Sequence, residues 1–158
     1  MSPVQFLAAV VVSYLGLLAG YCLASLTKEE LPTAKKIFPL LQRLSILAIA
    51  AVAMDAFNTG AATKIIVYLA LLIAVLFRLL LPVLYGALGL LVAAIAADQN
   101  ALLMVASLVF LCGLVSGSME FAAKARRKAD AIPQALQLLL SNAAYVAAAV
   151  ISFLVLRR

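Results

Sequence analysis

The fold of this chain is decided by residues 65–97, which read IIVYLALLIAVLFRLLLPVLYGALGLLVAAIAA. The run is apolar apart from one charged residue, Arg78, and it contains one proline, Pro82. As a straight helix it would be about 50 Å long at a rise of 1.5 Å per residue, whereas the hydrocarbon core of a bilayer is about 30 Å thick. The run therefore either turns back on itself around Arg78 and Pro82 or crosses the membrane once as an over-long, tilted helix.

The composition is typical of an integral membrane protein. Of the 158 residues, 68% are hydrophobic and 11% are charged, and the mean hydropathy is +1.22; ordinary soluble domains are only about half apolar. We therefore expect one transmembrane domain over residues 1–158. The net charge of +6 does not indicate nucleic-acid binding, because the basic residues cluster at the ends of apolar segments, as topology signals do.

The remaining apolar segments predict the other helices of an all-α protein. Residues 1–26 have no basic start, and their apolar stretch is long enough to span a bilayer, so we interpret it as a retained helix and not a cleaved signal. Pro39 and Pro133 suit the first turn of a helix, where a missing N–H costs nothing. The expected helices are residues 3–26, 39–57, 65–78, 82–97, 101–117 and 133–156.

Counting basic residues on the two sides of the membrane decides how often residues 65–97 cross. A single crossing leaves six basic residues on one side and five on the other, whereas a hairpin gives nine against three. Since cytoplasmic loops carry the excess of Lys and Arg, we expect six transmembrane helices arranged as three hairpins, with both termini outside. Each arm of the central hairpin is only about 20–24 Å long, so a re-entrant pair that does not cross fully remains an alternative.

In this topology the basic turns face the cytoplasm, which predicts a protein of the cell (cytoplasmic) membrane. Their positive charge favours contact with anionic lipid headgroups at that face. The predicted cytoplasmic interface consists of Arg43, Arg78, Lys124, Arg126, Arg127 and Lys128.

Two GxxxG motifs predict close helix packing. Gly16 and Gly20 lie in the first helix, and Gly113 and Gly117 end the fifth. Small residues four apart let helix backbones approach closely in lipid. The motifs, each followed by a basic loop and a proline-started helix, suggest a parallel repeat related by an axis along the membrane normal; chance similarity among alanine-rich segments is the alternative.

A few polar residues inside the spans are candidates for a transport pathway. Asp55 is a carboxylate in an apolar helix, which is costly unless it faces protein or water; the alternative is a hydrated position at the outer end of that helix. The last helix carries a polar stripe that includes Tyr145 and Ser152, and interhelical hydrogen bonding is its alternative role. The predicted pathway residues are Asp55, Gln137, Ser141 and Asn142.

The sequence contains no pattern that indicates an enzyme. Histidine is absent, and there is no HExxH, GxSxG or Walker motif, so we expect no catalytic residues, no metal site and no cofactor. We expect a small oligomeric transporter or channel for a small solute or ion. The main alternative is a non-catalytic scaffold or assembly subunit of a larger membrane complex, and a lipid-handling protein is a third. In either main case the expected partners are further copies of the chain or another membrane protein, together with lipid.

Overall fold

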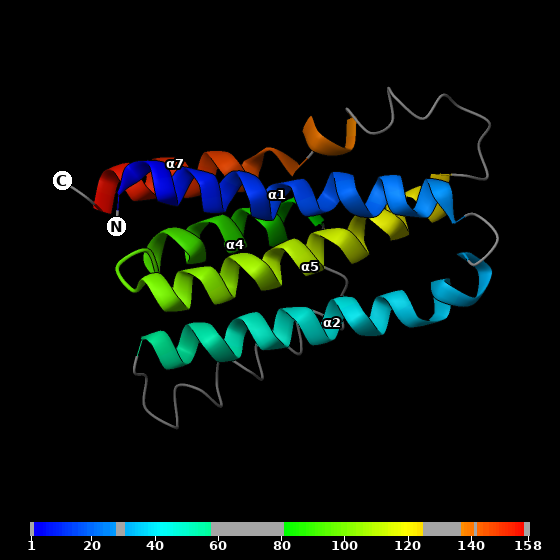
Figure 1. Ribbon diagram of the computed structural model, residues 1–158, viewed down its shortest axis with the longest axis horizontal. Coiled ribbons are helices and arrows are strands. Elements are labelled where there is room, and N and C mark those ends of the chain that lie inside the picture. Colours follow the sequence, from blue (N-terminus) through cyan, green and yellow to red (C-terminus); the bar gives the residue numbers. More distant parts are fainter. Residues whose placement is uncertain (1, 28–30, 58–80, 125–136, 141, 157–158) are drawn as a thin grey trace.

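The computed structural model describes residues 2–27, 31–57, 81–124, 137–140 and 142–156, and these residues form helices and short turns (Figure 1). Residues 137–140 are helical and precede the last helix, with Ala143 in a turn. The helices are α1 (Pro3–Leu26), α2 (Leu31–Ala56), α4 (Leu81–Ala94), α5 (Gln99–Lys124) and α7 (Ala144–Leu156).

Within the described residues, four helical segments are long and apolar enough to cross a membrane, which indicates a membrane protein. They are Pro3–Leu26, Ile37–Ala56, Gln99–Ala123 and Gln137–Val155. The apolar part of α4, Tyr85–Ala94, is shorter. The first arm of the predicted central hairpin, residues 65–78, lies outside the described residues, so the six crossings, the three hairpins and the outside termini stay predictions.

Several helix boundaries differ from those expected, and the differences are largest at the start of α2 and the end of α5. The helix α2 begins at Leu31, so Pro32 occupies its first turn and Pro39 lies inside it. The first-turn position that we expected for Pro39 is therefore taken by Pro32. The helix α5 continues beyond Gly117 to Lys124, because Phe121 packs edge-on against Tyr21 of α1, with ring centroids 5.1 Å apart.

Helices α1 and α5 run parallel and touch along their backbones. Gly16 faces the backbone of Phe110, and Gly20, one turn later, faces the backbone of Leu114. From the other side, a Cβ on Gly113 would lie 3.0 Å from the backbone nitrogen of Leu17. The two GxxxG motifs therefore interlock, and the absence of side chains at the four glycines permits the close approach.

The last helix runs antiparallel to α1. Phe6, near the start of α1, stacks on Phe153, near the end of α7, with ring centroids 4.0 Å apart, whereas Tyr14 hydrogen-bonds the carbonyl oxygen of Leu139. The first turn of α1 and the last turns of α7 therefore lie at the same end of the bundle (Figure 1). Helix α2 packs mainly on α5, and α4 packs mainly on α7.

Candidate functional site

The structure does not bring the predicted pathway residues together. Asp55 is exposed near the end of α2, and Gln137 is exposed before α7. Asn142 is buried, and its Nδ2 donates to the carbonyl oxygen of Leu138 at 2.9 Å. Ser141 lies outside the described residues. Because α2 packs on α5 whereas α7 packs on α4 and α1, Asp55 and Asn142 belong to different parts of the bundle.

The predicted cytoplasmic interface is described only in part. Arg43 is exposed on α2, and Lys124 is the last residue of α5. Arg78, Arg126, Arg127 and Lys128 lie outside the described residues. The contact of these residues with anionic headgroups stays a prediction.

A cluster of buried and half-buried polar side chains, which we call the hydroxyl cluster, lies between the helices instead. It consists of Ser13, Tyr14, Gln42, Tyr85, Ser116 and Tyr145. These residues come from α1, α2, α4, α5 and α7, so every one of these helices contributes a polar group.

One half of the hydroxyl cluster links α1 to α7. The hydroxyls of Ser13 and Tyr145 are 2.6 Å apart, and both side chains are buried. Ser13 donates its hydroxyl hydrogen to the carbonyl oxygen of Val10 at 2.9 Å. A serine hydroxyl has one hydrogen and two acceptor lone pairs, so Tyr145 is the donor to Ser13.

Aromatic contacts hold this half in place. The ring of Tyr145 lies nearly parallel to that of Tyr14, with centroids 6.0 Å apart and planes inclined by 9°. The ring of Tyr85 meets Tyr145 edge-on, with centroids 6.3 Å apart and planes at 89°. Edge-to-face and offset parallel geometries are the favourable ones for aromatic pairs, so the three rings fix the positions of their hydroxyl groups.

The other half of the hydroxyl cluster links α2 to α5 and faces α4. Gln42 Nε2 donates to Ser116 Oγ at 2.9 Å, and Ser116 Oγ donates to the carbonyl oxygen of Cys112 at 2.8 Å. The Tyr85 hydroxyl interacts with the Ser116 side chain, but this contact lacks the geometry of a regular hydrogen bond, and no other described residue supplies one. The Tyr85 side chain is 0% exposed.

The hydrogen bonding of the Tyr85 hydroxyl is therefore incomplete. Its neighbour Ser116 Oγ accepts from Gln42 with one lone pair and keeps a second, but among the described residues the Tyr85 O–H makes no hydrogen bond of regular geometry. A buried polar group without a partner costs several kilocalories per mole in hydrocarbon. A small molecule with both donor and acceptor groups would satisfy Tyr85 and Ser116 together.

The chemistry of the hydroxyl cluster is that of uncharged hydrogen bonding. Its members carry hydroxyl and amide groups and no ionised side chain. Within the described part of the chain, no three His, Cys, Asp or Glu residues come together as a metal site would require. Comparison of the chain with protein-family models, with curated proteins and with solved structures finds no match. The hydroxyl cluster is therefore the feature of the molecule from which a function can be inferred.

Sequence reasoning found only a fragment of this site. It placed Tyr145 on the polar stripe of the last helix, but it did not single out Ser13, Tyr85 or Ser116. The available signal was that each is a polar residue inside an apolar span, where such residues tend to face other helices. That signal does not say which polar residues meet.

Proposed function

We propose that the chain is a small multi-pass transporter or channel that passes a neutral, hydrogen-bonding solute through the hydroxyl cluster. The observation that carries the proposal is the buried Tyr85 hydroxyl, whose contact with Ser116 lacks regular hydrogen-bond geometry and which makes no other hydrogen bond to a described residue. A solute with one donor and one acceptor would complete the hydrogen bonding of both groups. Small polyols and amides have this chemistry.

The absence of ionised groups from the hydroxyl cluster supports a neutral solute over an ion. An ion in the hydrocarbon region needs compensating charge or full coordination, and the cluster offers hydroxyl and amide dipoles only. Asn142 lies three residues before Tyr145 and is buried as well, so it extends the same polar region. Asp55, which is exposed near the end of α2, would act only at the mouth of such a pathway.

Movement of α2 would give a solute access to the hydroxyl cluster. Tyr85 and Tyr145 are buried, so a solute can reach them only if a helix is displaced. Helix α2 packs mainly on α5 and carries Gln42, which bonds Ser116 beside Tyr85. Displacing α2 would therefore open the side of the cluster where the unused groups lie.

Flux measurements on proteoliposomes test the proposal. Stopped-flow light scattering with glycerol and urea reports the permeability to neutral solutes, and an entrapped pH dye reports proton flux. We expect glycerol or urea flux above that of protein-free liposomes, a strong loss in Tyr85→Phe, and retention in Tyr21→Phe. The control makes the same chemical change at a buried tyrosine that packs on Phe121.

Two results would contradict the proposal. Absence of accelerated flux for both neutral solutes would rule out this route. Flux that is equal in Tyr85→Phe and in the unaltered protein would show that the hydroxyl cluster is structural only.

The scaffold alternative is favoured by one feature of α2. Its residues Ile37, Leu40, Leu41 and Leu44 are exposed and recur at the spacing of one helix face. A partner helix could cover this face. A scaffold would co-purify with a fixed partner through this face, and Tyr85→Phe would leave that association unchanged.

A further inference from the structure

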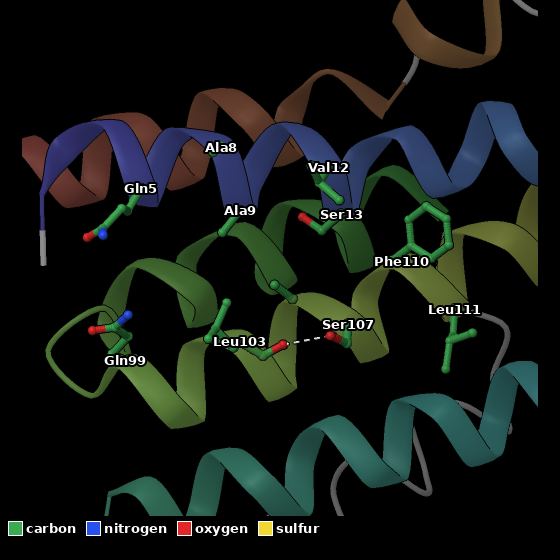
Figure 2. A pocket seen from close by; sticks show the side chains of 11 residues that line it. Gln5, Ala8, Ala9, Val12, Ser13, Gln99, Leu103, Ser107, Phe110 and Leu111 are labelled. Atoms are coloured by element: carbon green, nitrogen blue, oxygen red, sulfur yellow. Dashed lines mark hydrogen bonds between the residues drawn. The ribbon is translucent and has the colours of Figure 1, made fainter.

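A groove of about 640 Å³ lies between α1 and α5 on the side of the bundle shown in Figure 2. The two helices touch at their glycines, and the groove occupies the space between their earlier turns. Its walls are mainly apolar. The α1 wall consists of Gln5, Ala8, Ala9, Val12 and Ser13, and the α5 wall of Gln99, Leu103, Ala106, Ser107, Phe110 and Leu111.

With α1 and α5 as transmembrane spans, the groove would extend from one membrane boundary toward the middle of the bilayer. Gln5 and Gln99 lie near the starts of these two parallel candidate spans. From Gln99 to Leu111 the wall is about 18 Å long, and from Gln5 to Ser13 it is about 12 Å, at 1.5 Å per residue. One leaflet contributes about 15 Å of hydrocarbon. The groove therefore matches one leaflet in depth.

The glycine contact closes the inner end of the groove. Gly16 meets the backbone of Phe110 immediately beyond Ser13. A transmembrane helix has to cross both leaflets, so a helix lying in this groove would meet the α1–α5 contact halfway.

We propose that the groove is a binding site for one acyl chain of a bilayer phospholipid, whose glycerol region lies at the level of Gln5 and Gln99. Both glutamines are exposed at the outer end. Gln5 Oε1 accepts from the Ser2 backbone N–H at 3.1 Å, which leaves Nε2 to donate to an ester carbonyl oxygen of the lipid. The groove shares Ser13 with the hydroxyl cluster, but lipid binding here does not require solute transport through that cluster.

Photo-crosslinking in liposomes tests the site. The full chain is reconstituted in phosphatidylcholine mixed with a rising fraction of phosphatidylcholine that carries a diazirine in one acyl chain, and crosslinks are mapped by mass spectrometry. We expect labelling of residues 5–13 and 99–111 to saturate at a low fraction of the probe. Labelling near Leu154, an exposed residue of α7, should rise in proportion to the probe.

Variants that fill the groove provide the control. Ala8→Phe and Ser107→Phe add a ring from opposite walls, and both positions are exposed; each should reduce groove labelling several-fold. Ala147→Phe makes a comparable change at an exposed position of α7 and should leave it unchanged. Labelling near Leu154 serves as the internal reference for correct insertion.

Two outcomes would overturn the proposal. Groove labelling that rises in proportion to the probe, as on α7, would mean ordinary boundary lipid. Absence of lipid labelling in the groove, with labelling near Leu154 retained, would mean that no acyl chain occupies the groove.

Discussion

Replacing Gly20 with alanine should separate α1 from α5. The added Cβ would lie 2.6 Å from the carbonyl carbon of Leu114, whereas carbon atoms in contact are normally about 3.5–4.0 Å apart. The helices would have to move apart by about 1 Å, and overpacking of this kind costs about 1–3 kcal/mol. The bond from Ser118 Oγ to the Gly20 carbonyl oxygen, 2.9 Å long, would also stretch, at a cost of about 0.6 kcal/mol.

The same substitution at Gly86 is the matched control. A Cβ on Gly86 meets no atom within 4 Å, so Gly86→Ala should gain up to about 1 kcal/mol from the better helix propensity of alanine. Gly20→Ala has that gain too, but the overlap outweighs it. We expect the free energy of unfolding of Gly20→Ala to lie about 2 kcal/mol or more below that of Gly86→Ala.

Unfolding of the protein in mixed micelles by increasing SDS, followed by far-UV circular dichroism, measures this difference. Gly16→Ala, which overlaps the Phe110 backbone in the same way, should behave like Gly20→Ala. The reasoning is refuted if Gly20→Ala is as stable as Gly86→Ala, because the glycine contact would then not limit the approach of α1 and α5.

Three further predictions concern other parts of the bundle. Ser13→Ala should lower the free energy of unfolding by about 1–3 kcal/mol, because it leaves the buried Tyr145 hydroxyl without its acceptor. Tyr145→Phe should lower it less, because Ser13 keeps its hydrogen bond to Val10. Equal losses for the two variants in the SDS titration would contradict this. N-ethylmaleimide should label the exposed Cys22 in micelles well before the buried Cys112, and equal labelling rates would show that α5 is accessible from outside the bundle. Reporters fused before residue 3 and after Asn100 should give the same topology signal, since α1 and α5 run parallel, and both should read external; a cytoplasmic signal at Asn100 would overturn the six-helix topology.

The local sequence pattern was enough to predict that a helix forms in each of these segments. The residue at which a helix ends also depended on contacts with residues far away in the sequence. The bounds of α1, Pro3–Leu26, were predicted from the long apolar run there; the structure adds that Ser2 caps the helix and that Pro3 lies in its first turn. At α2 two prolines compete for the same role, and the lysines after Pro32 resemble a loop. The extension of α5 to Lys124 depends on Phe121 packing against Tyr21, and no local pattern contains that contact.

The hydroxyl cluster was hard to predict for a related reason. Charge draws attention in an apolar sequence, so Asp55 stood out, yet the structure places it in an exposed position. Ser13 and Tyr145 are individually unremarkable, because serine and tyrosine are common in membrane spans. Their significance comes from a hydrogen bond between residues 132 positions apart, which depends on how the helices are arranged.

The parallel contact between α1 and α5 has a consequence for biogenesis. Helix α1 ends at Leu26 and α5 begins at Gln99, so at about 5–20 residues per second α1 is complete for several seconds before its partner is synthesised. During that interval the surface around Gly16 and Gly20 faces lipid, the insertion machinery or another nascent chain. A chain that stalls before α5 would present an open GxxxG surface, which is a known dimerisation motif. Such truncated products should pair with each other through α1, whereas the finished protein satisfies this surface within one chain.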